Sequence, residues 1–305
     1  VVGASNGGHR SKAHSSMETK GHRPRFRKLV PRIVTELILI LAIALVFTPV
    51  YLLVVDSFKP AKAISLRPFS LPNPPTLANY QRALGSAGKN AVSDIVRMYR
   101  NSVLITSTSV LLIIALTPLA GYYLGRTSGM FANLVLLYFL VGFMIPREIV
   151  LIPLINNFRA WRISGTLPSM CLYYFGLHST FSVLLYGKFV KTIPRELDES
   201  ALIDGARKGQ IFWRIVFPLL KPCTLSAVIF IGLAVWNDFL GPLLLLGGQL
   251  GSTITLGVYR GADQYLTDWG MIFAFIVLAS APMLILFLAL QRWFIRGLVE
   301  GAVKG

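Results

Sequence analysis

Residues 194–218 read PRELDESALIDGARKGQIFWRIVFP, a charged segment that separates two long apolar stretches of the chain. Within this segment, particular residues stand at fixed intervals: Glu199, Ser200, Ala201, Gly205, Ile215 and Pro218. Acidic side chains crowd its first residues, and acids are favoured near the N-terminal end of a helix because of the helix dipole. Gly205 then allows the chain to turn sharply. The segment therefore predicts a short helix, a turn and a second helix.

Apolar stretches dominate the rest of the chain. Of its 305 residues, 54% are hydrophobic and 14% are charged, whereas soluble domains carry about 25% charged residues. A helix needs about 20 apolar residues to cross a bilayer. Stretches of that length lie at 33–55, 101–125, 131–155, 169–190, 216–246 and 270–291. Buried core helices are the alternative, but six of them cannot all be internal in so short a chain. We therefore expect an all-α, polytopic membrane protein with six transmembrane helices.

The spacing inside 194–218 resembles a known family signature. It follows the EAA pattern of the cytoplasmic loop in permease subunits of ATP-binding-cassette importers, and only Ser200 departs from that pattern. The resemblance implies a type I importer permease fold with a cytoplasmic coupling helix that receives force from a separate ATPase. The residues it assigns to ATPase coupling are Glu199, Ser200, Ala201, Asp204, Gly205, Ile215 and Pro218.

Other segments resemble the carbohydrate branch of the same family. Pro75, Thr76, Asn79 and Tyr80 fit an element of its first outer loop. The sequences WNDFLGP (236–242) and LQRWFIRGLVEGAVKG (290–305) are similar to segments of the second, maltose-type permease subunit. This resemblance implies import of a carbohydrate, an oligosaccharide in particular, by alternating access. A permease for peptides, amino acids or ions is the alternative, and so is a membrane scaffold that transports nothing.

The distribution of basic residues predicts the orientation in the membrane. The net charge is +17, and Lys and Arg gather in the N-terminal tail, around 194–218 and at the C-terminus, as expected for cytoplasmic segments. We therefore expect a multi-pass protein of the bacterial cytoplasmic (inner) membrane with both termini in the cytoplasm. This pattern favours contact with membrane lipid and argues against nucleic acid as a partner.

The same features divide the chain into parts. We expect a disordered basic cytoplasmic tail at 1–30, the first transmembrane helix with an extracytoplasmic loop at 31–100, a core transport domain at 101–292 that contains the coupling loop 194–218, and a cytoplasmic tail at 293–305. The chain begins with Val1, and either Val1 or Met17 can be the true start.

Polar residues within the apolar stretches are candidates for a translocation pathway. An ionisable group at bilayer depth is costly and normally faces a cavity or a partner. The candidates are Arg147, Glu148, Trp236, Asn237 and Asp238. For Arg147 and Glu148, a position near the membrane surface is an equally good interpretation.

Chemistry of other kinds is not indicated. The sequence lacks the phosphate-binding pattern GxxxxGK[ST], so we expect no cofactor in this chain and place ATP and magnesium in a partner ATPase. No catalytic constellation or metal-ligand pattern stands out, which argues against an enzyme and against a metal site. The expected partners are a homologous permease subunit, an ATPase subunit dimer and an extracytoplasmic solute-binding protein.

The first outer loop is basic. It carries Lys59, Lys62, Arg67, Arg82, Lys89, Arg97 and Arg100 against Asp56 and Asp94. Such a surface could steer an anionic ligand or an acidic binding protein. This observation raises the hypothesis of an acidic oligosaccharide, such as an alginate or pectate fragment. A solvated loop without a ligand is the alternative.

Overall fold

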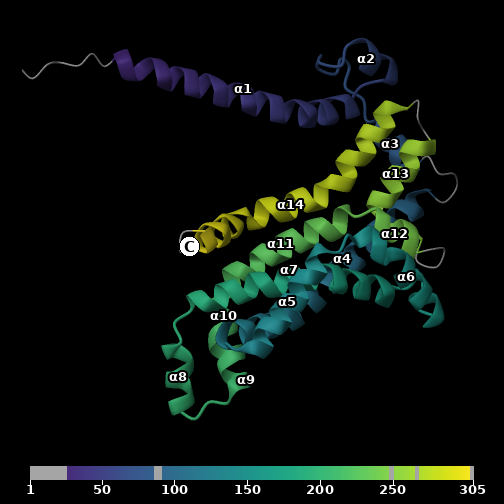
Figure 1. Cartoon of the computed structure of the whole chain (residues 1–305). Coiled ribbons are helices and arrows are strands. Elements are labelled where there is room, and N and C mark those ends of the chain that lie inside the picture. The colour runs from purple at the N-terminus through teal and green to yellow at the C-terminus, as the bar shows by residue number, and fades with distance from the viewer. Residues whose placement is uncertain (1–25, 86–90, 247–250, 265–267, 303–305) are drawn as a thin grey trace, which may run out of the picture. The chain divides into compact units, whose positions relative to one another are not determined.

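The computed structural model describes residues 26–85, 91–246, 251–264 and 268–302, and these are helical with short connections (Figure 1). Within those ranges there is no strand, which confirms the all-α fold. The longer helices are α1 (Phe26–Ser57), α4 (Ala91–Arg126), α5 (Met130–Met144), α6 (Arg147–Ala160), α7 (Leu167–Thr192), α11 (Lys221–Asn237), α13 (Ile254–Gln264) and α14 (Trp269–Ala302). The shorter ones are α2 (Ala61–Leu66), α3 (Ala78–Gly85), α8 (Glu196–Ile203), α9 (Lys208–Ile211), the π-helix η2 (Phe212–Val216), α10 (Phe217–Leu219) and α12 (Leu240–Leu245).

The chain forms two compact units, residues 1–50 and residues 51–305. Residues 1–25 of the expected disordered tail lie outside the described residues, while residues 26–30 belong to α1. At the other end, α14 continues to Ala302 without a break at residue 292. Along α1, apolar side chains are exposed on all sides, Leu45 to 74% for example. A helix that is apolar all round is typical of a membrane span.

The long helices account for the six expected transmembrane stretches. Three helices are long and apolar enough to cross a membrane: Ile33–Ser57, Ile95–Arg126 and Trp269–Arg292. Two bent pairs, α5 with α6 and α9–α10 with α11, raise the number to five if each pair counts as one span. The more polar α7, with 26 residues, covers the remaining stretch. The expected stretches are therefore helical, and five of them, two as bent pairs, have the length and hydropathy of a membrane span.

The third stretch is broken where one helix was predicted. Helices α5 and α6 meet at an angle of 98°. The break lies at Ile145, which is extended (φ −75°, ψ 122°). Pro146 explains this conformation, because a proline disfavours the helical region for the residue before it. The prediction of a continuous span at 131–155 is wrong for this reason.

The fifth stretch is also interrupted. A bend of 72° separates Lys208–Leu219 from α11, and α11 ends at Asn237, with α12 starting only at Leu240. The predicted single span at 216–246 is therefore wrong in its extent. The helix α13 lies in a region for which the sequence indicated no element. Its first residue, Ile254, donates its backbone N–H to the hydroxyl of Ser102 on α4 at 2.9 Å.

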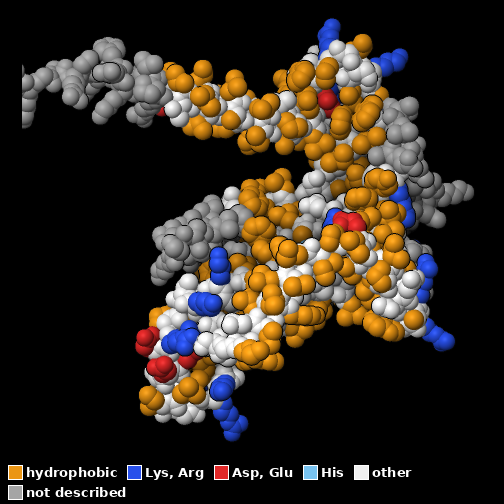
Figure 2. Space-filling model, in the orientation of Figure 1, with side chains coloured by type: hydrophobic (Ala, Val, Ile, Leu, Met, Phe, Trp, Pro, Cys, Tyr) orange, Lys and Arg blue, Asp and Glu red, His pale blue; other side chains and the backbone are white. Residues whose placement is uncertain are grey.

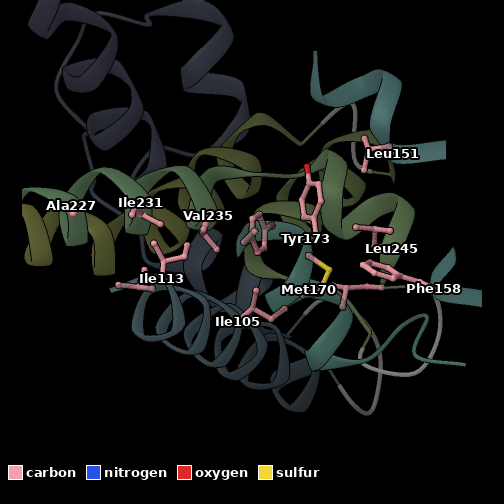
Figure 3. Close-up of a cluster of buried hydrophobic side chains, with 13 residues drawn as sticks. Ile105, Ile113, Leu151, Phe158, Met170, Tyr173, Ala227, Ile231, Val235 and Leu245 are labelled. Carbon is pink, nitrogen blue, oxygen red and sulfur yellow. The ribbon is translucent and has the colours of Figure 1, made fainter. Parts of the chain in front are cut away.

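A buried apolar cluster joins the helices of the 51–305 unit (Figure 3). It draws on α4, α6, α7, α11 and α12. Its members include Ile105, Ile113, Leu151, Phe158, Met170, Tyr173, Ala227, Ile231, Val235 and Leu245. Because burial of apolar side chains is the main favourable term in folding, this cluster fixes the positions of the polar residues described below.

The end of α1 is held by residues of the first outer loop. The Asn79 side chain is fully buried and donates to the carbonyls of Ser57 and Lys59 at 2.8 and 2.7 Å. The Tyr80 hydroxyl lies 2.8 Å from that of Ser57. These contacts satisfy carbonyl groups that a helix end leaves without partners. The family-like element around Asn79 and Tyr80 therefore has a structural explanation.

Candidate functional site

The segment 194–218 adopts the predicted helix, turn and helix. In Figure 1, α8 and α9 project beyond the ends of α7 and α11. The turn is a Schellman motif, in which the N–H groups of Ala206 and Gly205 donate to the carbonyls of Ala201 and Leu202 at 2.9 and 3.0 Å. Gly205 has φ +81°, a conformation that side chains other than glycine adopt at a cost. The glycine of the pattern thus ends α8 and turns the chain back.

Most of the predicted coupling residues lie on the surface of this projection. Glu199, Ser200 and Asp204 are exposed, and nothing lies within 4 Å of the position that a Cβ atom on Gly205 would occupy. Ile203 next to them is 86% exposed. In Figure 2, charged side chains gather at the end of the unit that carries α8 and α9. An exposed, mixed surface on a helix–turn–helix projection has the form that a docking loop requires.

The remaining coupling residues hold the projection in place. Ala201 is 7% exposed and packs in an apolar cluster with Phe212 and Val216. Ile215 belongs to the π-helix and is half-buried against the same cluster. Pro218 is the second residue of α10, and a proline is tolerated there because the first helical N–H groups need no partner within the helix. π-helical turns are rare and often occur at functional sites.

An ion pair that the sequence did not indicate attaches α8 to α4. Arg126 donates to both carboxylate oxygens of Asp198, at 2.8 and 3.2 Å, and both side chains are nearly buried. The Tyr122 hydroxyl donates to the same carboxylate at 3.0 Å. The sequence assigned Asp198 only a role toward the helix dipole. Arg126, at the end of an apolar stretch, was the one available signal of such a pair.

The candidate pathway residues do not form one site. Asp238 is 6% exposed, and its Oδ2 accepts from the Tyr174 hydroxyl and from the Gly241 N–H, both at 3.2 Å. Its Oδ1 lies 3.5 Å from Nη1 of Arg147, whose Nε donates to Glu148 at 3.1 Å. The ion pair of Arg147 with Asp238 therefore links the break that follows α5 to the break that follows α11.

The other two candidates lie apart from this network. Trp236 is buried, and its ring N–H donates to the carbonyl of Ala279 on α14 at 3.0 Å. Asn237 is exposed. The structure therefore gives Trp236 a packing role between α11 and α14, whereas Arg147, Glu148 and Asp238 are brought together.

A small hollow lies beside Arg147. Its volume is about 240 Å³, and its walls include Gly142, Arg147, Leu172 and Tyr173. Among the described residues, the buried hydroxyl of Tyr173 has no hydrogen-bond partner. A buried hydroxyl without a partner costs free energy. Tyr173 was not among the pathway residues that the sequence indicated.

The basic outer loop is less basic than its composition indicates. Lys59 is 1% exposed, lies 2.7 Å from Asp56 and donates to the carbonyls of Arg67 and Pro68. Arg82 pairs with Asp268 at 2.6 Å. Lys62, Arg67, Arg97 and Arg100 are exposed, and Lys89 lies outside the described residues. The interpretation of all seven side chains as a free basic surface is wrong for Lys59 and Arg82, since each is paired.

Membrane-spanning helices with a projecting helical loop define the class of this protein as a polytopic membrane permease. Residues 117–300 match the family described as "Binding-protein-dependent transport system inner membrane component", and the chain belongs to that family. It is therefore an inner-membrane component of a transport system that depends on a binding protein.

Relatives over nearly the full length carry sugar-transport names. The chain is 30% identical to the "Probable starch degradation products transport system permease protein AmyC" of Thermoanaerobacterium thermosulfurigenes, in an alignment that covers 84% of this chain and 91% of that protein. It is 33% identical to the "Melibiose/raffinose/stachyose import permease protein MelC" of Bacillus subtilis, in an alignment that covers 90% of this chain and 97% of that protein. It belongs with sugar ABC transporter permeases.

A solved structure shares the fold. A chain of a bacterial ABC transporter involved in the import of the acidic polysaccharide alginate aligns with a TM-score of 0.71. The alignment covers 89% of this chain and 98% of that chain, at 21% identity. This likeness confirms the importer-permease fold that the EAA-like spacing implied.

Proposed function

We propose that this chain carries an oligosaccharide across the membrane as one of two homologous permease subunits, driven by a separate ATPase dimer. The exposed helix–turn–helix at α8 and Gly205 carries this proposal, because it presents the EAA-like residues outside the helical bundle. ATP and magnesium bind in the ATPase subunits, and solute arrives on an extracytoplasmic binding protein. Closure of the ATPase dimer moves α8, and the two permease subunits then expose their shared cavity to the outside.

An oligosaccharide is the proposed class of solute. The names of relatives that are at least 30% identical refer to starch degradation products, to multiple sugars, to melibiose, raffinose and stachyose, and to diacetylchitobiose. The hypothesis of an acidic oligosaccharide is narrower. Its support is the set of exposed cations that includes Lys62 and Arg67, together with the alginate importer that shares the fold.

The cognate binding protein provides the test of the solute class. Its affinity for neutral oligosaccharides, acidic oligosaccharides, dipeptides and inorganic anions can be measured by titration calorimetry. Specific binding of an oligosaccharide, with no heat from the other classes, is the expected result. Tight binding of a peptide or an ion would remove the carbohydrate proposal, and preference for a neutral sugar would remove only its acidic form.

We also propose that the coupling loop and both termini face the cytoplasm. In that orientation the turn between α4 and α5 is cytoplasmic and α2 is external. Single cysteines at Ser128 and at Ser65, both exposed, test it in a background with Cys171→Ser and Cys223→Ala. An impermeant thiol reagent should label position 65 in whole cells and label position 128 only after lysis. The opposite pattern would reverse the orientation.

A further inference from the structure

Arg126 occupies the point where α4, α7 and α8 meet. Beyond its two bonds to Asp198, it donates to the carbonyls of Val190 at 3.2 Å, Ile193 at 2.8 Å and Pro194 at 3.4 Å. Those carbonyls belong to the end of α7 and to the linker into α8. One side chain at the end of α4 therefore contacts both the helix before the coupling loop and the coupling helix itself.

The geometry favours a rigid link. A guanidinium that faces a carboxylate with two parallel N–H···O bonds is fixed in direction as well as in distance. The side chains of Arg126 and Asp198 are 12% and 13% exposed, so water weakens their attraction little. Tyr122 stands one helical turn before Arg126 and adds a bond to the same carboxylate.

The tyrosine extends the link to the second half of the loop. The ring of Tyr122 lies 5.4 Å from that of Phe212, which is buried at the start of the π-helix. Phe212 packs in the same apolar cluster as Ala201 of α8. Both halves of the coupling loop are thus attached to one face of α4.

We propose that Arg126 and Asp198 form a clamp that makes the coupling helix move as one body with the cytoplasmic ends of α4 and α7. The covalent chain alone would transmit a displacement of α8 to α7, through the short linker at 193–195, and toward α11, through the turn at Gly205. The clamp adds α4 and stiffens the link to α7, and these two helices supply much of the buried cluster of the transport unit. Arg126 and Asp198 are positioning residues in this proposal, which rests on the proposed coupling to an ATPase.

Distance measurement on the assembled transporter tests the proposal directly. Spin labels at Glu196 of α8 and at Ser128 after α4 occupy exposed positions outside the EAA-like set. With the clamp intact, the distance between them should be the same with and without ATP. In Arg126→Gln the distribution should broaden and shift on ATP binding. If the distance changes with ATP in the labelled protein that keeps both Arg126 and Asp198, the proposal is overturned.

Transport provides the second readout. Arg126→Gln and Asp198→Asn should each lower uptake per ATP hydrolysed by about tenfold, within the range for residues that carry coupling between sites. The double variant should be no worse than the worse single variant, because each removes the same pair. Arg126→Lys keeps the charge but not the bidentate geometry, so its uptake per ATP should lie between that of the unaltered protein and that of Arg126→Gln. Lys191→Gln, an exposed cation at the end of α7, serves as the matched control.

The outcomes separate this inference from the proposed function. Loss of the ATPase subunits during purification of Asp198→Asn would place Asp198 in the docking surface and contradict a clamp. If the losses of the two single variants multiply in the double variant, Arg126 and Asp198 act independently, which would also contradict a clamp. If the ATPase subunits are retained and uptake per ATP equals that of the unaltered protein, the clamp is overturned while the ATPase-driven permease stands. If no ATPase subunit binds to the unaltered chain, the proposed function itself fails.

Discussion

Replacement of Gly205 by aspartate should abolish the stimulation of ATP hydrolysis by loaded binding protein. The residue is exposed at the tip of the coupling loop, and a side chain there would project from the surface into a docked partner. A charge buried without a partner in the centre of an interface costs about 2 kcal/mol or more, a factor of at least roughly thirty in affinity. The fold should survive, because aspartate tolerates the left-handed conformation better than most residues.

Two variants separate docking from folding. Ser128→Asp places the same charge at another exposed position, in the turn between α4 and α5. It should keep stimulated hydrolysis. Gly205→Asn has the same size as the aspartate variant without its charge, so its residual activity measures the steric part of the effect. Equal loss in Ser128→Asp and Gly205→Asp would show general destabilisation and remove the docking role.

Replacement of Asp238 by leucine should give the largest loss of stability. The Tyr174 hydroxyl and the Gly241 N–H would both lose their acceptor in a buried site. Each buried donor left without a partner costs about 1–3 kcal/mol, which adds to roughly 2–6 kcal/mol for the pair. A Cβ on Gly241 would lie 2.5 Å from Asp238 Oδ2, so the chain has little room to rearrange there. The melting temperature of purified protein in detergent, followed by size exclusion, measures this loss.

The charge of Asp238 is tested apart from its hydrogen bonds. Asp238→Asn keeps an acceptor for the two donors but loses the attraction to Arg147. It should melt within a few degrees of the unaltered protein, as should Arg147→Gln, because the 41% exposed arginine is partly solvated. If the pair links the two helix breaks during transport, both variants should lower the uptake rate alike. Normal uptake in both would restrict Asp238 to a structural role.

The helix, turn and helix at 194–218 were predictable because the spacing of the residues that form them is local. The pattern from Glu199 to Gly205 lies within one short helix and its terminal turn, and the Schellman geometry follows from the glycine itself. The long apolar stretches likewise predicted their helices, since length and hydropathy suffice for a membrane span.

Other features were not predictable from local spacing or from composition. The pairing of Arg126 with Asp198 joins residues far apart in sequence, and no local pattern indicates it. The burial of Lys59 was missed because composition counts a charge without its partner. The break at Ile145 was within reach, since Pro146 was visible inside the predicted span, but apolar runs alone do not distinguish a straight helix from a bent pair.

Uptake into vesicles tests the central claim most directly. The chain would be assembled with its partner permease and its ATPase subunits in proteoliposomes, in the orientation that exposes the extracytoplasmic face outward. Labelled oligosaccharide should accumulate only with ATP inside and the loaded binding protein outside, and it should not accumulate when a complex with Gly205→Asp is used. Uptake without ATP or without the binding protein, or equal uptake in the Gly205→Asp complex, would contradict an ATPase-coupled permease that works through this loop.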